Sequence, residues 1–276
     1  MSLMPAKREL VSILIPIFNE EDGVELLKEK LLGLQNLLEN EYELEFLFID
    51  DGSSDLTVPR LRKSFRDAAI TTRILQHGVN QGVGAAFRTG FQKAQGDYVC
   101  TIDADCTYSP EGLQQLLSAL KSSGADIAVA SPYHPDGGVE GVAAWRLVLS
   151  KGCSMLYRFF SPLKLYTYTS IFRAYRGDVV RSVQFRGNGF VSASEILIAA
   201  GRQGYTVTEI PMVLRARSVG RSKMKVLRTI MSHLEMLFSF AGSISAAPPR
   251  RPAARVRGTL VSTRVTATNN KDPFAA

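Results

Sequence analysis

Two aspartates separated by one residue, Asp103 and Asp105, are the clearest indication of chemistry in this chain. They directly follow the apolar run 98–102 (YVCTI), which is typical of a buried strand. Two carboxylates at this spacing reach one hard cation, and Mg²⁺ or Mn²⁺ takes oxygen ligands while bridging to substrate phosphates. Aspartate also favours turns and helix N-caps, so the pair taken alone has a structural interpretation as well.

The elements around these aspartates decide between the two interpretations. Apolar, β-branched runs predict strands at 11–18, 45–49, 73–76, 98–102 and 126–130. Leucine stripes and helix-start signals predict helices at 23–38, from 55 to about 68, 82–94 and 110–121. This alternation predicts parallel strands covered on both faces, and ligands bind at the carboxyl ends of such strands. The aspartates fall at such an end, which favours the metal site.

The rest of the chain breaks this alternation. It predicts a loop at 132–141, a helix at 143–160, a partly extended stretch at 166–176, a helix at 192–203, a strand at 206–214 and a helix at 223–240. We therefore expect an α/β fold with a mostly parallel sheet and helices on both faces. The expected organisation is a catalytic domain over 1–222, an amphipathic helix over 223–247 and a flexible basic tail over 248–276.

Two further motifs follow predicted strands. The run 50–55 (DDGSSD) reads as a strand-to-helix turn, in which Asp51 is able to accept hydrogen bonds from a base or ribose and Asp55 caps the next helix. The run 80–86 (NQGVGAA) partly mimics a dinucleotide-binding loop, but Phe87 stands where the third glycine belongs. A nicotinamide dehydrogenase is therefore disfavoured, and we expect these glycines to serve close helix packing.

The charge is uneven. The chain carries a net +7, of which the tail 248–276 holds six basic residues against Asp272 alone. A second basic cluster spans 202–228, where the loop from Arg217 to Lys223 has three cations, two serines and a glycine that suit a diphosphate. A solvated basic face is the alternative interpretation of this cluster.

Several classes of site are disfavoured. Three cysteines without a C-x-x-C spacing argue against disulfides and zinc, and the three histidines are scattered, with His233 expected at a surface or interface. Glu195 has two interpretations, an active-site acid or a half-buried structural one. No secretory signal, membrane span or nucleic-acid partner is predicted, which is consistent with a cytoplasmic protein.

Taken in order over residues 11–235, these motifs resemble the family 2 glycosyltransferases of the GT-A fold, and most closely the dolichyl-phosphate (polyprenyl-phosphate) sugar transferase branch. The motifs that carry the resemblance are 16–20 (PIFNE), 50–55, 80–86, 103–105 (DAD), 170–175 (SIFRAY), 209–211 (EIP) and 217–223 (RSVGRSK). This sequence departs from the family pattern at three positions. Thr107 stands where Gln is common, Pro132 where Arg is usual, and Ile171 where Gly is usual.

The resemblance implies a role for each matching position. The residues that would bind the nucleotide-sugar are Pro16, Phe18, Glu20, Ile49, Asp51, Asp103 and Ala104. The metal, Mg²⁺ or Mn²⁺, would bind Asp103 and Asp105. The catalytic set would be Asp105, Arg217 and Lys223, with the last two closing over the phosphates. The acceptor phosphate would meet Arg146, Ser150 and Arg173.

The implied activity is metal-dependent, inverting transfer of a hexose such as mannose or glucose from a GDP- or UDP-sugar to a polyprenyl phosphate. Two alternatives stay open: the same fold acting on a hydroxyl acceptor, with Glu195 or Asp136 as the base, and a catalytically weakened nucleotide-sugar-binding protein. A polyprenyl acceptor predicts peripheral attachment at the cytoplasmic membrane face through the apolar stripe of helix 223–240 and the basic tail. That stripe alternatively packs on the domain core or on a second copy of the chain.

Overall fold

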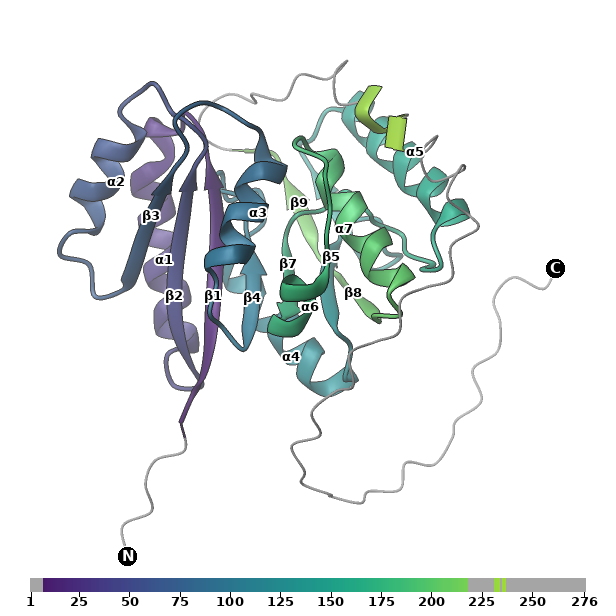
Figure 1. Cartoon of the computed structure of the whole chain (residues 1–276), viewed down its shortest axis with the longest axis horizontal. Helices are drawn as coiled ribbons and strands as arrows, with labels where there is room; N and C mark the ends of the chain where they lie inside the picture. The colour runs from purple at the N-terminus through teal and green to yellow at the C-terminus, as the bar shows by residue number, and fades with distance from the viewer. Residues whose placement is uncertain (1–6, 218–230, 234, 237–276) are drawn as a thin grey trace, which may run out of the picture.

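The structure, a computed structural model, describes residues 7–217, 231–233, 235 and 236 (Figure 1). Its strands are β1 (Glu9–Ile17), β2 (Tyr42–Asp50), β3 (Thr71–Gln76), β4 (Tyr98–Thr101), β5 (Ile127–Ser131), β6 (Gly138–Glu140), β7 (Arg173–Arg176), β8 (Val207–Pro211) and β9 (Val213–Arg215). Its α-helices are α1 (Val24–Leu38), α2 (Thr57–Phe65), α3 (Val83–Lys93), α4 (Leu113–Ser123), α5 (Ala144–Phe160), α6 (Gly177–Ser182) and α7 (Val191–Arg202). The predicted tail 248–276 and nearly all of the predicted helix 223–247 lie outside the described residues.

Seven strands form the main sheet in the order β3-β2-β1-β4-β7-β5-β8 (Figure 1). Neighbouring strands pair in parallel, except that β7 runs antiparallel to both β4 and β5. The mostly parallel α/β sheet predicted from the sequence is confirmed. The insertion of β7 between β4 and β5 was not predicted, because the segment 173–176 is short and its sequence carries no signal of strand direction.

Helices cover both faces of the sheet because the apolar strands are buried on both sides. On β1, Ile13 and Ile15 join one core cluster with α1, α2 and α4, whereas Leu14 joins the other with α3, α6 and α7. Successive side chains of a strand point to opposite faces, so a continuous apolar run packs against both helical layers. The two layers fix the carboxyl ends of the parallel strands at one edge.

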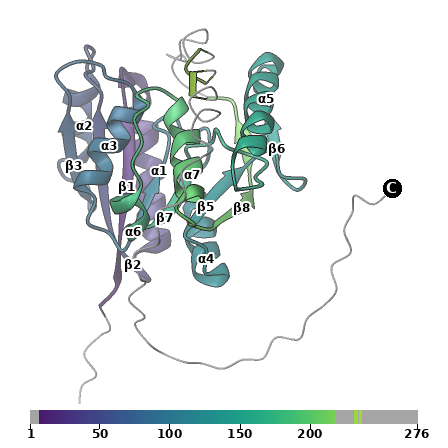
Figure 2. The same cartoon turned by 45° about the vertical axis from the view of Figure 1, so that its right-hand side comes forward.

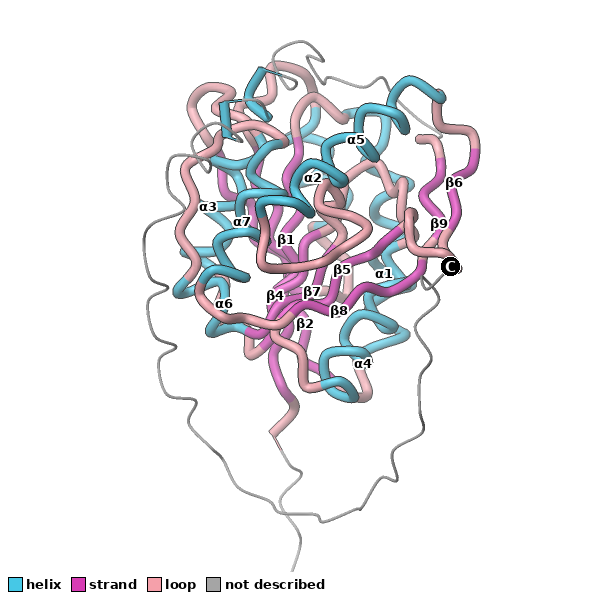
Figure 3. Tube along the Cα trace, turned by 90° about the vertical axis from the view of Figure 1, so that its right-hand side faces the viewer, coloured by secondary structure: helices cyan, strands magenta, loops and turns pink. Residues whose placement is uncertain are grey.

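Two regions differ from the sequence prediction. The predicted loop 132–141 contains β6, and the predicted strand 206–214 is two strands, of which β9 leaves the main sheet to pair with β6 (Figure 3). At the break, the Met212 amide still donates to the Ser131 carbonyl of β5, at 3.4 Å. The Met212 carbonyl accepts from Gly138 N at 3.2 Å.

His233 packs against Tyr157 of α5. The Tyr157 hydroxyl lies 2.5 Å from His233 Nδ1, and His233 and Met236 are both buried. Of the two expected positions for His233, a surface or an interface, its burial excludes an exposed surface position. Burial lowers the pKa of His233 to about 4, because the charged imidazolium is poorly solvated there.

In the part of the chain that the structure describes, no helix is both long and apolar enough to cross a bilayer.

Candidate active site at the carboxyl edge of the sheet

The loops that follow β1 and β2 interlock at the carboxyl edge. The Asn19 amide donates to Ser53 Oγ and the Ser54 amide donates to Asn19 Oδ1, both at 2.8 Å. The Glu20 amide donates to Thr57 Oγ1 at 2.8 Å. These bonds explain why polar residues end both apolar strands, since each loop satisfies the backbone donors of the other.

Asp51 is held by groups of the chain itself. Its carboxylate accepts from the amides of Gln81 and Gly82 at 3.0 and 2.7 Å, and lies 2.8 Å from His77 Nδ1. The second ring nitrogen of His77 lies 2.9 Å from Thr89 Oγ1. The side chain of Asp51 is 5% exposed, so its position is set before any ligand arrives.

His77 is a site residue that the sequence analysis missed by treating the histidines as scattered. It directly follows β3, whose carboxyl end lies at the same edge as that of β2. That position was the available signal, because residues that follow adjacent parallel strands lie close together.

The glycines of the 80–86 run serve close backbone packing, as predicted. A Cβ on Gly82 would lie 2.3 Å from the Asn188 carbonyl oxygen, and one on Gly84 would lie 2.1 Å from that of Gly187. Gly82 also has φ of 99°, which side-chain-bearing residues avoid. The Gly84 amide donates to the Asn188 carbonyl at 2.7 Å, so this helix start is occupied by protein.

The second carboxylate site follows β4. Asp105 accepts from Arg217 through Nε at 3.1 Å and Nη2 at 2.5 Å, and from the Thr107 amide at 3.2 Å. Burial raises the pKa of Asp103, and the neighbouring Asp105 carboxylate raises it further, while Arg217 lowers it. Two carboxylates in this setting repel each other and carry a desolvation cost.

Arg217 links motifs from the two ends of the described domain. Its Nη1 lies 3.3 Å from Glu20 Oε1, while the same guanidinium binds Asp105. Burial alone would lower the pKa of Arg217, and the hydrogen bond and charge of Asp105, followed by Glu20, raise it. The guanidinium is therefore a fixed positive charge between the loops after β1 and β4.

The residues present fit a divalent cation with few protein ligands. A cation between Asp103 and Asp105 would relieve their mutual repulsion, as Arg217 now does in part. No cluster of three or more His, Cys, Asp or Glu side chains suited to a metal occurs within the described ranges. The remaining ligands would thus come from water and substrate oxygens, which is how Mg²⁺ is usually bound.

The other predicted nucleotide positions fall at the same edge, with one difference. Pro16 and Phe18 are half-buried at the end of β1, and Ala104 lies between the two aspartates. Ile49, however, is fully buried and packs under Gly90 of α3, so its side chain supports the site without lining an open pocket. Lys223 lies outside the described residues.

The three predicted acceptor residues lie on two elements, with Arg146 and Ser150 one turn apart on α5 and Arg173 on β7. Ser150 and Arg146 lie on α5, where Ser150 Oγ is 2.6 Å from Thr169 Oγ1 and the Arg146 guanidinium lies over the Trp145 ring. Arg173 is only 1% exposed, and it donates to the carbonyls of Ala193 and Tyr168 at 2.7 and 2.9 Å. The structure therefore gives Arg173 a structural role that ties β7 to α7, in place of the expected contact with an acceptor.

Glu195 also has a structural role in the described contacts. Its two carboxylate oxygens accept from the amides of Arg186 and Gly187 at 2.9 and 2.7 Å. These bonds shape the turn whose next carbonyls meet Gly82 and Gly84. Of the two interpretations left open, the contacts favour the structural one.

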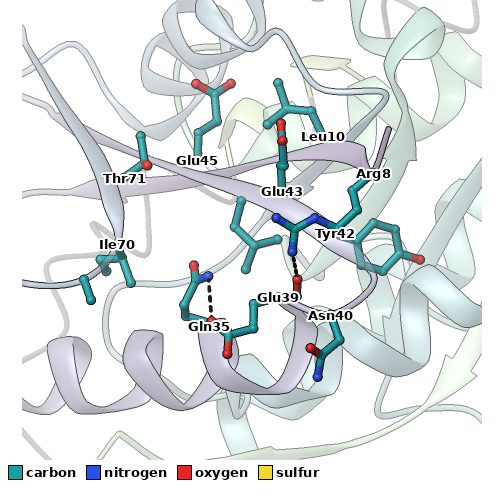
Figure 4. A pocket seen from close by; sticks show the side chains of 12 residues that line it. Arg8, Leu10, Gln35, Glu39, Asn40, Tyr42, Glu43, Glu45, Ile70 and Thr71 are labelled. Atoms are coloured by element: carbon teal, nitrogen blue, oxygen red, sulfur yellow. Dashed lines mark hydrogen bonds between the residues drawn. The ribbon is translucent and has the colours of Figure 1, made fainter. Parts of the chain in front are cut away.

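A hollow of 820 Å³ lies elsewhere, at the opposite end of the sheet (Figure 4). It is lined by residues such as Arg8, Glu39, Tyr42 and Thr71, which belong to the amino ends of β1, β2 and β3 and the end of α1. Arg8 closes part of it by donating to the Glu39 carbonyl. None of the chemical motifs reaches it, so we place the candidate site at the carboxyl edge.

The mostly parallel sheet with helices on both faces, and the acidic motifs at its carboxyl edge, agree with the GT-A fold that the resemblance implies. The chain belongs to glycosyl transferase family 2, whose sequence model matches residues 12–183, more than half of the chain.

Similar proteins include a dolichol-phosphate mannosyltransferase of Pyrococcus furiosus, 31% identical over 85% of this chain, and a polyprenol monophosphomannose synthase of Mycolicibacterium smegmatis, 28% identical over 81%. The match spans 65% of the first relative's length and 83% of the second's. In structure, the chain resembles glucosyl-3-phosphoglycerate synthase from Mycobacterium tuberculosis, solved with Mn²⁺, UDP and glucosyl-3-phosphoglycerate. That likeness has a TM-score of 0.61, 18% identity, and covers 89% of this chain and 82% of the other.

Proposed function

We propose that this protein transfers a hexose from a nucleoside diphosphate sugar to a polyprenyl phosphate, with inversion at the sugar carbon and with Mg²⁺ or Mn²⁺ as cofactor. The observation that carries the proposal is the contact of Arg217 with both Asp105 and Glu20. It joins one basic and two acidic residues of separate motifs at the edge where parallel sheets bind ligands. The names of the two mannosyltransferase relatives support the polyprenyl acceptor.

The acidic and basic side chains of the proposed site have different roles in binding the donor. Among the described residues, Asp51 Oδ2 accepts one hydrogen bond, from the Gly82 amide, and a carboxylate oxygen can accept a second from a donor on the base or ribose. Arg217 faces the place where negative charge grows on the leaving diphosphate, and a bound divalent ion would add positive charge there. An acceptor phosphate is already anionic, so its attack on the sugar needs no general base.

The direct test is product analysis. We expect the full chain to convert labelled GDP-mannose or UDP-glucose and a short-chain polyprenyl phosphate in detergent into a labelled, butanol-extractable lipid, and to require Mn²⁺ or Mg²⁺. Omission of the lipid phosphate is the control. A label that stays with water-soluble products, or transfer that is undiminished in EDTA, would contradict the proposal.

The open alternatives make different predictions in the same assay. A hydroxyl acceptor would need a base, and the described contacts of Glu195 leave it engaged with two amides. Asp136, the other proposed base, lies in the loop before β6 beside His134, 3.5 Å away. A weakened nucleotide-sugar-binding protein, suggested by Thr107 and Pro132, would bind donor without turnover. Peripheral attachment at the cytoplasmic face of a membrane is part of the favoured proposal.

A further inference from the structure

Helix α5 turns an apolar face to solvent. Five of its large apolar side chains are exposed: Trp145 by 48%, Val148 by 69%, Met155 by 63%, Leu156 by 41% and Phe159 by 77%. At about 100° per residue these positions share one side of the helix. The opposite side holds Ser154 and Tyr157, which are buried against the domain. We call the five exposed side chains the α5 stripe; the helix that carries them lies at the margin of the molecule (Figure 2).

The charges on α5 have one sign. Its charged residues are Arg146, Lys151 and Arg158, with no acid among its 17 residues. Each cation lies over an aromatic ring, at 5.2 Å from Trp145, 5.3 Å from Tyr133 and 5.4 Å from Tyr166 respectively. The helical spacing places Arg146 on one flank of the stripe and the other two on the opposite flank. The apolar face is thus bordered by cations held in place.

We propose that the α5 stripe docks on an anionic lipid bilayer, with its apolar side chains in the headgroup–acyl boundary and its flanking cations at the lipid phosphates. The proposal rests on the proposed function in one respect, that the acceptor is a membrane lipid. Exposed apolar side chains gathered on one helix face mark an interaction surface. Flanking cations without acids complement anionic headgroups, and a helix of about 25 Å lies along the interface without spanning it.

This docking surface is connected to the acceptor side of the site. Ser150 on α5 contacts Thr169, and Thr167 lies 2.8 Å from Ser131 at the carboxyl end of β5. The Glu209 carboxylate fixes the same segment by accepting from the amides of Tyr166 and Thr167 at 2.8 and 2.9 Å. Docking through α5 therefore holds Arg146 and Ser150 near the plane of the lipid phosphates. This surface differs from helix 223–240 and the basic tail, on which the sequence alone placed membrane binding.

The chain contains its own probe, because Trp145 in the α5 stripe is its only tryptophan. We expect its emission to shift to the blue with phosphatidylglycerol–phosphatidylcholine vesicles, and to be quenched by brominated acyl chains. Pure phosphatidylcholine or high salt should weaken both signals. The double variant Val148→Ser/Phe159→Ser should weaken vesicle binding by about tenfold or more. The matched control, Leu37→Ser, removes an exposed leucine on α1 and should bind as the unaltered chain does.

Three results would overturn the inference. In the first, the protein sediments with vesicles while Trp145 emission stays unchanged, and binding is lost on deletion of residues 248–276; the tail would then be the docking element. In the second, Trp145 is already shielded without lipid in a dimer detected by ultracentrifugation, so a second copy covers the stripe. In the third, Trp145 is shielded from water-soluble quenchers in the monomer, so the chain's own residues 218–230 or 237–276 cover it.

The assay with short-chain acceptor in detergent separates this inference from the proposed function. Transfer without docking would leave the function standing and remove the membrane surface. Docking without transfer would leave the membrane surface standing and remove the proposed function.

Discussion

Asp51 and Asp105 lie at the same edge of the sheet, but different parts of the chain hold them. Asp51 is bound by His77, Gln81 and Gly82, all within about 30 residues of it. Asp105 is bound by Arg217, 112 residues away, from a segment that follows the last described strand. The proposed nucleotide side is therefore built from residues close in sequence. The proposed phosphate side is completed by a distant cation that a metal and a diphosphate would have to displace.

The largest expected effect comes from replacing Asp105, the carboxylate that the distant Arg217 binds. Asp105→Asn should lower transfer by roughly 1,000-fold, because one of the two proposed protein ligands for the cation is lost. Stability should change little, since the substitution also removes the repulsion on Asp103. Turnover and circular dichroism on the same preparation measure both. Undiminished turnover in saturating Mn²⁺ would remove the metal from the mechanism.

The second prediction is that Arg217→Ala slows transfer but tightens the binding of Mn²⁺. Arg217→Ala should cost about 2–5 kcal/mol of transition-state stabilisation, read from kcat/KM. Without nucleotide, however, it should tighten Mn²⁺ binding, because no guanidinium then competes for Asp105. The matched control is Arg215→Ala, which removes an exposed cation that pairs with Glu140. Equal Mn²⁺ affinity in the variant and the unaltered chain would mean that Arg217 does not restrain the metal site.

The third prediction concerns another contact between distant residues, that of His233 with Tyr157 of α5. The pKa of His233 lies near 4 when docked and near 6.5 when released, so the docked form disfavours the proton. Its stabilisation is therefore complete only well above pH 6.5 and is lost as the pH falls, by about 1.6 kcal/mol between pH 6.5 and 5. The hydrogen-exchange protection of the amides of His233, Glu235 and Met236, measured relative to the intrinsic rate at each pH, should fall accordingly. His233→Phe should abolish that pH dependence; a slope that survives the substitution would assign it to another group.

The smallest expected effect concerns the locally built site. His77→Ala should weaken nucleotide binding by about 1–2 kcal/mol, because Asp51 loses one of its three hydrogen-bond partners. The amide bonds of Gln81 and Gly82 should keep Asp51 near its place, so kcat should change less than the dissociation constant. Calorimetric titration with GDP and UDP measures the loss. His134→Ala is the matched control, and an equal loss there would remove the special role of His77.

Much of the fold could be predicted because its signals are local. Apolar runs specified β1, β2, β4 and β5, and the leucines of α1 specified a buried helical face. The positions of Asp51, Asp103 and Asp105 followed from the rule that ligands meet the carboxyl ends of parallel strands.

What the sequence could not specify depends on distant partners. Nothing in residues 173–176 indicates that they enter the sheet between β4 and β5, or that Arg173 donates its hydrogen bonds to backbone carbonyls. A pattern that marks Ile49 as apolar does not distinguish a pocket wall from a core position. The outward-facing stripe of α5 was also missed, because periodicity identifies an amphipathic helix but not which face meets the domain.

The position of β7 has a consequence for how the polypeptide acquires its shape during synthesis. Thr101 of β4 pairs with Arg173 and Tyr98 with Arg176, so one edge of β4 stays unpaired until residues 173–176 have left the ribosome. A nascent chain that ends in α5 therefore presents an open strand edge, which is a template for intermolecular pairing. Fragments that stop before Arg173 should aggregate, whereas a fragment that includes β7 and β8 should be able to close the sheet.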